Sequence, residues 1–250
     1  VDTFGGIEAN PEFETICKAT EYARAQSTDF ILAVGGGSVI DAAKLLAVGI
    51  DYQGDLWDIV LAGINLDQKI SHQPCPFGSV LTLPATGSEM NSGSVISRRA
   101  SNDKLFFNHP QLYPAFSVLD PAYTFSLDAR QSANGIVDAF THTMEQYLTC
   151  PCDAPLQDRI SEGILQTLIE EGPKVMRNFQ DYQARSQVMW CAAMALNGLI
   201  GAGVAQDWST HMIGHELTAV YGLDHAQTLA IVLPRVLEYK MASKKQKLVQ

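Results

Sequence analysis

The sequence predicts an α/β domain over residues 1–127, followed by an all-helical domain over residues 128–250. Two observations carry this prediction. Short apolar segments that are typical of buried strands are confined to the part before Leu127. After Leu127 the apolar positions recur with the period of helices alone. The change of pattern therefore predicts a domain boundary at Leu127.

A glycine turn near the start of the first domain is the first candidate binding segment. A buried strand at Phe30–Val34 runs into Gly35-Gly36-Gly37-Ser38, and a helix is expected over Val39–Val48. Such a turn is typical of phosphate binding, because the backbone approaches closely and the helix start attracts an anion. A tight turn with no ligand is the alternative. Asp41, expected in the first helical turn, either binds a ribose or nicotinamide-side hydroxyl or simply stabilises the helix dipole.

A polar turn after the next predicted strand is the second candidate. The strand at Ser79–Leu83 leads into Pro84–Asn91, which is dense in hydroxyl and amide side chains. Doubly wound α/β proteins hold ligands at such strand ends. The other elements expected in this domain are a strand end at Val1–Gly6, helices from Asn10-Pro11 to about Ala25 and near Leu56–Leu61, and strands at Val95–Arg98, Leu105–Phe107 and Ala115–Leu119.

The second domain is expected to contain helices alone. Pro234 should start or kink the last part of the final helix, because proline lacks a backbone donor. The helices are expected at about Ala129–Leu148, Leu156–Glu171, Tyr182–Gly198, Asp207–Tyr221 and Ala226–Met241.

Histidines and one aspartate in these helices form a candidate metal site. Asp138 and His142 are four residues apart, as are His211 and His215, so each pair lies on one helix face. His225 follows a predicted helix stop at Gly222 and can fold back toward His211. Carboxylate and imidazole ligands suit zinc, iron, manganese or cobalt rather than calcium. Histidines that only fill the core or cap a helix remain the alternative.

Composition limits the partners and the compartment. The 250 residues carry a net charge of −10, which argues against nucleic acid and against an anionic membrane surface. Five cysteines, an odd number, indicate a reducing cytoplasm rather than a disulfide framework. The sequence has no pattern of a signal peptide or of a membrane span.

Several phrases occur together in a known order. They are Gly-Gly-Gly-Ser-Val-Ile-Asp-Ala-Ala-Lys from Gly35, Leu-Pro-Ala-Thr-Gly-Ser-Glu from Leu83, the Asp138 to His142 pair, and the three histidines from His211. In this combination the sequence resembles the iron-containing, or group III, alcohol dehydrogenase family. Gly-Leu-Asp-His-Ala-Gln-Thr-Leu-Ala-Ile-Val-Leu-Pro from Gly222 resembles the branch of NADPH-dependent aldehyde reductases and butanol dehydrogenases.

The resemblance implies a role for each candidate residue. One divalent metal, iron or zinc, would be held by Asp138, His142, His211 and His225, while His215 would lie beside nicotinamide and substrate as a catalytic residue that relays a proton. The cofactor, NADP(H) in preference to NAD(H), would contact Gly36, Gly37, Ser38, Asp41, Thr82, Thr86, Ser88, Asn91, Lys104, Tyr123 and Leu127.

The activity implied is hydride transfer between NADPH and a short to medium chain aldehyde, with the metal polarising the carbonyl oxygen. Phe140, Met144, Trp208 and Leu127 are candidates for an apolar substrate lining. Two other functions stay open. One is a lyase of the dehydroquinate-synthase type, which would need a basic cluster that residues 134–227 lack. The other is a binding protein whose helical domain is held together by a metal.

The resemblance also implies how much of a family member this sequence represents. Family members begin with a further strand and glycine-rich turn and continue through several helices beyond Gln250, so the sequence corresponds to the middle two-thirds. The Rossmann-like domain is then N-terminally truncated and the helical domain C-terminally truncated. The preceding segment would hold much of what separates NADPH from NADH. The full-length protein is expected to be a homodimer.

Overall fold

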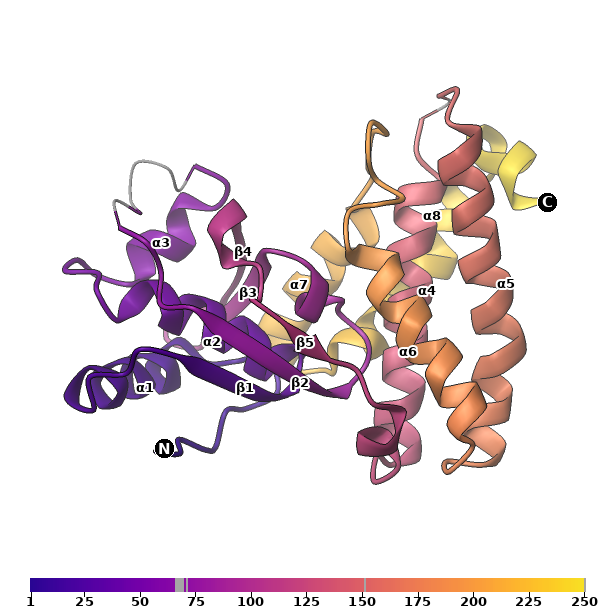
Figure 1. Ribbon diagram of the computed structural model, residues 1–250. Helices are drawn as coiled ribbons and strands as arrows, with labels where there is room; N and C mark the ends of the chain where they lie inside the picture. Colours follow the sequence, from indigo (N-terminus) through magenta and orange to yellow (C-terminus); the bar gives the residue numbers. More distant parts are fainter. Residues whose placement is uncertain (66–69, 71, 151, 250) are drawn as a thin grey trace. The chain divides into compact units, whose positions relative to one another are not determined.

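The computed structural model (Figure 1) divides into two compact units. The first, called here the α/β unit, comprises Val1–Thr82 and Ser88–Leu119. The second, called the helical unit, comprises Leu83–Gly87 and Asp120–Gln250. The structure describes residues 1–65, 70, 72–150 and 152–249. None of the described helices is both long enough and apolar enough to cross a membrane.

The α/β unit contains a three-stranded sheet in the order β1-β2-β5 and a separate antiparallel pair, β3-β4. Strands β2 and β5 are parallel, with Ser79 opposite Ser117. The elements are α1 (Phe13–Ala25), β1 (Ile31–Gly36), α2 (Gly37–Gly49), α3 (Trp57–Ala62), β2 (Phe77–Leu83), η2 (Ser88–Met90), β3 (Gly93–Arg98), β4 (Asp103–Asn108), η3 (Pro110–Leu112) and β5 (Ser117–Val118).

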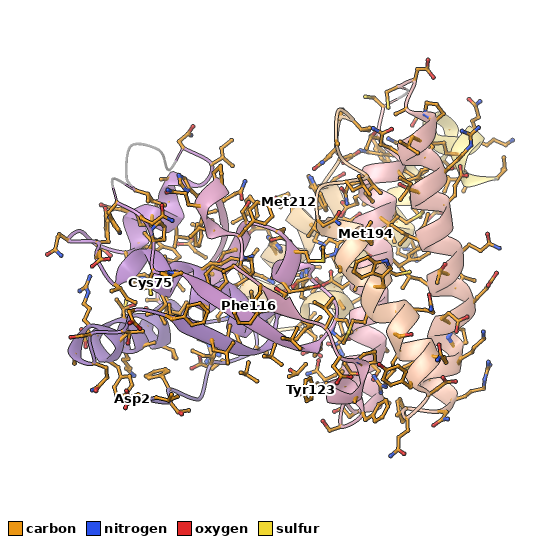
Figure 2. The ribbon with its side chains drawn as sticks, viewed as in Figure 1. Asp2, Cys75, Phe116, Tyr123, Met194 and Met212 are labelled. Carbon is orange, nitrogen blue, oxygen red and sulfur yellow. The ribbon has the colours of Figure 1, made fainter. Side chains whose placement is uncertain are left out.

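Helix α2 is the centre of this unit. It begins directly after β1 and packs against β1, β3 and α1. Its inner face, including Leu45 and Val48, joins a buried core with Ile16 and Phe107. Phe116, labelled in Figure 2, lies beside β5. Its ring stacks on that of Phe30, with centroids 6.0 Å apart. The glycine turn is therefore fixed between a strand and a buried helix.

Two details of the α/β prediction are wrong. Val1–Gly6 forms no strand; its side chains are mostly exposed, and no described strand pairs with it. The reason is that a strand needs a neighbour to satisfy its backbone groups. Helix α2 also starts at Gly37 rather than at Val39, so Asp41 lies in its second turn. Asp41 is thus too far from the helix start for the dipole role to be its main one.

In the helical unit a short 3₁₀ turn precedes the long helices, and α4 lies at the centre of the unit. Helix α4 packs against each of α5, α6, α7 and α8. Ala139 from α4, Leu168 from α5 and Ala192 from α6 lie in one buried apolar cluster. The elements are η4 (Pro121–Thr124), α4 (Ala129–Tyr147), α5 (Pro155–Arg177), α6 (Tyr182–Leu196), α7 (Ser209–Tyr221) and α8 (His225–Leu248).

Two helices of this unit continue through a proline. Helix α5 continues through Pro173 to Arg177, past the expected end at Glu171. Helix α8 likewise runs through Pro234, which starts no new helix. Buried neighbours explain both cases, since Val175 and Leu233 pack into the unit and offset the backbone hydrogen bond lost at each proline. The predicted fold class, a Rossmann-like α/β part followed by an all-helical part, is confirmed.

Candidate metal centre

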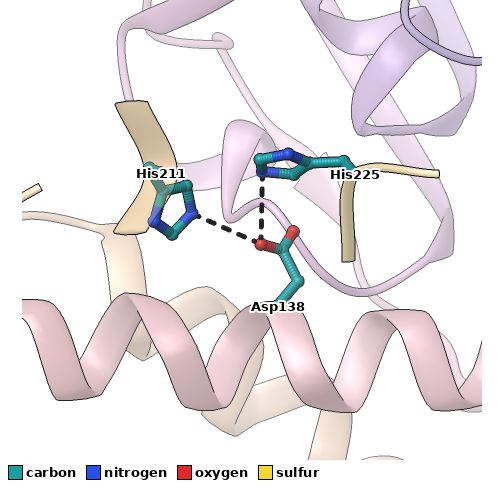
Figure 3. Close-up of side chains that lie close together, drawn as sticks. All are labelled: Asp138, His211 and His225. Carbon is teal, nitrogen blue, oxygen red and sulfur yellow. Dashed lines mark ion pairs between the residues drawn. The ribbon is translucent and has the colours of Figure 1, made fainter. Parts of the chain in front are cut away.

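The carboxylate of Asp138 is the point on which three histidines of the helical unit converge. Its Oδ1 atom lies 3.5 Å from Nε2 of His142, 3.6 Å from Nε2 of His211 and 3.6 Å from Nε2 of His225. Figure 3 shows His211 and His225 pointing at this oxygen from two different elements. Ligand atoms of Asp138, His211 and His225 all lie within 4.8 Å of one another. One ion can therefore reach all three side chains.

His142 approaches the same oxygen in a different way. Its ring stacks on the ring of His211, with centroids 4.6 Å apart and planes at 17°. The group of mutually close ligand atoms comprises Asp138, His211 and His225 without His142. His142 as the fourth ligand stays a prediction.

The polar atoms of the centre fit a cation. Asp138 Oδ1 and His211 Nε2 are buried and have no hydrogen-bond partner among the described residues. An unsatisfied buried carboxylate oxygen is costly, and a cation bound there would remove that cost. A buried carboxylate beside several imidazoles is also the ligand set that zinc and ferrous iron accept.

The protonation states of Asp138 and His142 favour metal binding as well, whereas Asp138 and Glu145 outweigh burial and raise the pKa of His211. Burial alone would raise the pKa of Asp138, but His142, His211 and His225 outweigh it and hold that pKa well below its usual range. Asp138 is therefore a carboxylate at neutral pH. Burial lowers the pKa of His142 to about 4, so that its ring is neutral at pH 7. Metal ligands must be deprotonated, and these two groups already are.

Local sequence explains how the elements present these side chains. The four-residue spacing puts Asp138 and His142 on one face of α4. Gly222 ends α7 in the left-handed conformation, with φ of 66°, as predicted for a helix stop. Helix α8 then begins at His225, which brings that side chain back to α4.

His215 lies one turn after His211 on α7 and is buried. Its ring centroid is 5.2 Å from that of His225 and 6.3 Å from that of His211. The structure therefore places His215 beside the centre, outside the group of mutually close ligand atoms.

The predicted cofactor residues of the α/β unit lie around the glycine turn. Asn10 links two of them, since its backbone N–H donates to Ser38 Oγ at 3.2 Å and its Oδ1 accepts from Lys104 Nζ at 2.9 Å. Asn91 Oδ1 accepts from Lys44 Nζ at 3.1 Å. Asn10 was not among the candidates; its place directly before Pro11 gave no signal of this role.

Asp41 uses both carboxylate oxygens inside this unit. Oδ1 accepts from Ser88 Oγ at 2.7 Å, and Oδ2 accepts from the backbone N–H of Val95 at 2.9 Å. Burial raises its pKa. The carboxylate thereby ties the second candidate turn to α2 and β3, so any contact with a ligand has to share these oxygens.

The other predicted cofactor residues are distributed over both units. Gly36 and Gly37 stand where β1 gives way to α2, and Thr82 is near the end of β2. In the helical unit, Thr86 lies in the 83–87 segment, Tyr123 is 51% exposed (Figure 2), and Leu127 lines a small cavity.

The chain matches two family models in succession. The model of iron-containing alcohol dehydrogenases matches residues 1–121, and the C-terminal model of the Fe-containing alcohol dehydrogenase family matches residues 132–250. The chain belongs to the iron-containing alcohol dehydrogenase family. The predicted family is thus confirmed.

Individual members of the iron-containing alcohol dehydrogenase family are similar over almost the whole chain. The NADPH-dependent aldehyde reductase YqhD of Escherichia coli K12 is 55% identical over 249 residues, which are 99% of this chain and 63% of that protein. The probable NADH-dependent butanol dehydrogenase 1 of Bacillus subtilis 168 is 41% identical over 253 residues, again 63% of its length. The chain therefore spans about 63% of these relatives.

Solved structures of family members have the same fold. The crystal structure of E. coli K-12 YqhD superposes with a TM-score of 0.94 at 55% identity, covering 98% of this chain and 62% of that one. The NADH-dependent butanol dehydrogenase A of Thermotoga maritima gives a TM-score of 0.91 at 33% identity, covering 98% and 60%.

Two of the residues predicted for the apolar lining pack inside the helical unit, and their role as a lining stays a prediction. Met144 is buried in a helix–helix cluster with Tyr147 and Leu165, and Phe140 packs against the same cluster. These side chains therefore contribute to the packing of the helical unit. Trp208 does adjoin the centre, with its ring 5.3 Å from the ring of His211.

The sequence reading also missed Glu145. Its carboxylate bonds to Nδ1 of His211 and accepts the backbone N–H of Thr210 at 2.6 Å. The signal available was its place on α4, seven residues or two turns after Asp138, which puts it on the ligand face.

Proposed function

We propose that the chain carries the nucleotide and metal sites of an NADPH-dependent aldehyde reductase that acts on short to medium chain aldehydes. In the reverse direction the same enzyme is an alcohol dehydrogenase. The observation that carries the proposal is the convergence of three imidazole nitrogens within 3.6 Å of one buried Asp138 oxygen, in a chain of this family. Residues 1–127 would form the dinucleotide-binding domain and residues 128–250 the metal-binding domain.

The residues that would hold the metal, iron or zinc, are Asp138, His142, His211 and His225. A bound divalent metal supplies a Lewis acid that polarises a carbonyl oxygen. The chain's own part is to keep the site ready for it. Asp138 stays ionised and His142 neutral at pH 7, since the surroundings shift the pKa of each in that direction.

The residues proposed to bind the nicotinamide cofactor include the glycine turn and the side chains that Asn10 and Asp41 hold in place. The backbone N–H groups at the start of α2 can donate hydrogen bonds to a pyrophosphate, and Lys104 adds a positive charge to this surface. NADPH supplies the hydride. The name of the E. coli relative, an NADPH-dependent reductase, favours NADPH over NADH.

His215 is the residue proposed to move a proton toward the product oxygen. Its support is position, because it is buried beside His225 and outside the group of mutually close ligand atoms. His215→Ala should reduce turnover by about 100-fold or more while bound metal stays stoichiometric. Loss of metal from this variant would instead make His215 a ligand.

Compartment and assembly are part of the proposal. The five cysteines are free, which supports a reducing cytoplasm. A homodimer is proposed for the full-length protein on the family resemblance.

The test is NADPH oxidation with butanal, followed by absorbance, on protein loaded separately with zinc and with ferrous iron. Metal-free protein and NADH are the controls. Metal-dependent oxidation of NADPH with aldehyde consumption is expected. Stoichiometric metal and NADPH binding without turnover would overturn the reductase function for this chain, and failure to bind metal would overturn the site itself.

A further inference from the structure

Glu145, near the end of α4, connects that helix to the start of α7. Its main-chain carbonyl accepts from the N–H of Asp207 at 3.2 Å. Its side-chain Oε1 accepts from the N–H of Thr210 at 2.6 Å and from that of His211 at 3.4 Å. Its Oε2 bonds to Nδ1 of His211. The side chain is buried, so these bonds are shielded from water.

The first turn of α7 depends on this carboxylate. Trp208, at the N-cap position, makes no side-chain cap, and the opening N–H groups of a helix have no partners within it. Asp207 Oδ1 takes the N–H of Ser209, and Glu145 takes the next two. A negative charge at a helix start is also favourable to the helix dipole.

The same carboxylate fixes which nitrogen of His211 carries a hydrogen. A carboxylate only accepts hydrogen bonds, so Nδ1 of His211 must be the donor in this pair. The neutral ring then presents the lone pair of Nε2, the atom 3.6 Å from Asp138 Oδ1. Only this tautomer can offer Nε2 to a metal.

We infer that Glu145 is a positioning residue for metal binding, which holds His211 in the tautomer and orientation that a ligand requires. This inference rests on the metal site of the proposed function. It goes beyond that function, which assigns His211 as a ligand but assigns no partner to its Nδ1. Partners of this kind, a carboxylate on the far nitrogen of a histidine ligand, raise metal affinity by about 10- to 100-fold.

Glu145→Gln separates this role from capping. The amide of glutamine has one oxygen, and the backbone N–H groups of Thr210 and His211 both donate toward that position. The NH₂ group therefore faces Nδ1 of His211. Nδ1 then has to accept, and Nε2 carries the hydrogen. The cap survives while the ligand tautomer is disfavoured.

The matched control is Glu162→Gln. Glu162 lies on α5 in the same unit, and its Oε1 accepts from the hydroxyl of Tyr147 at 2.8 Å. Glu162 bonds to Tyr147 rather than to a residue of the centre, so the same chemical change tests for a general effect of losing a carboxylate.

The experiment measures three quantities on the whole chain. Zinc affinity is determined by competition with a chelator, the tautomer of His211 by long-range ¹H–¹⁵N correlation in metal-free protein, and the unfolding midpoint by circular dichroism without metal. Glu145→Gln is expected to weaken zinc by about 10- to 100-fold, to move the hydrogen of His211 toward Nε2, and to keep the midpoint close to that of Glu162→Gln.

Three outcomes would contradict the inference. Wild-type zinc affinity in Glu145→Gln would overturn it while leaving the metal site intact. Weaker zinc with an unchanged tautomer and a lower midpoint would reduce Glu145 to a helix cap. A wild-type chain that binds no zinc would overturn the metal site itself and the inference with it.

Discussion

Alanine substitution at two helix glycines should change stability in opposite directions. Gly135 lies inside α4 and Gly163 inside α5. A β-carbon on Gly135 would lie 2.3 Å from the carbonyl oxygen of Pro84, whereas one on Gly163 meets nothing within 4 Å. The chemistry is the same at both sites, so only the surroundings differ.

The structure gives the size of each effect. In an open helix position, alanine is favoured over glycine by about 0.5–1 kcal/mol, which is the gain expected at Gly163. At Gly135 the obstacle is backbone, and it has to retreat by roughly 1 Å to reach ordinary contact. Overpacking of this kind costs about 1–3 kcal/mol, which exceeds the helix gain. Gly135→Ala should therefore lose about 1–2 kcal/mol net.

Thermal unfolding of metal-free protein, followed by circular dichroism at 222 nm, is the assay. In a chain of this size 1 kcal/mol shifts the midpoint by about 2–4 °C, so Gly163→Ala should rise by about 1–4 °C and Gly135→Ala should fall by about 2–8 °C. A rise in both variants would refute the close contact between α4 and the 83–87 segment. Asp138 is three residues beyond Gly135, so zinc affinity should also fall in Gly135→Ala alone.

Three buried or paired charges predict how stability varies with pH. Burial raises the pKa of Glu89 from 4.5 to about 6, so the folded chain holds this proton more tightly than the unfolded chain. The free energy of unfolding should therefore fall by about 2 kcal/mol as pH rises from 4.5 to 6. Glu89→Gln should abolish that fall in urea titrations. Burial lowers the pKa of Lys44 from 10.5 to about 8, so stability should rise between pH 8 and 10.5, and a flat profile that matches Lys44→Met would contradict this. Burial opposes the shift at Asp207, but the bonds from Lys240 and Ser209 prevail and lower its pKa from 3.8 to about 2; this stabilisation is present above pH 3.8 and is lost as pH falls to 2. Asp207→Asn should lose about 1 kcal/mol at pH 7 after allowance for solvent screening, and an unchanged urea midpoint would show that the pair with Lys240 contributes nothing.

The sequence predicts elements well where one periodicity runs uninterrupted. Helix α4 was expected over residues 129–148 and covers Ala129–Tyr147, because its apolar stripe is regular and Asp128 caps its start. Helix α5 was expected to end at Glu171 but continues to Arg177, because packing prevails over local preference there. Val1–Gly6 forms no strand, because no described strand pairs with it.

The candidate site is predictable within a helix and unpredictable between helices. Spacing alone puts Asp138 and His142 on one face of α4. The same four-residue spacing puts His211 and His215 on one face of α7. Nothing in either spacing says which histidine of α7 meets Asp138. The crossing of α7 over α4 decides this, and that crossing is a property of packing.

Glu145 shows what the spacing could not supply. His211 and His215 lie four residues apart on one face of α7, and Nδ1 of His211 bonds to a carboxylate of α4. That bond simultaneously completes the first turn of α7, so the helix start and the ligand nitrogen are set by one side chain. The partner of the far nitrogen of His211 lies 66 residues away in the chain, so the spacing within α7 could not indicate it. Searching for a carboxylate one or two turns beyond a ligand pair would find such residues from sequence, because they share the ligand face.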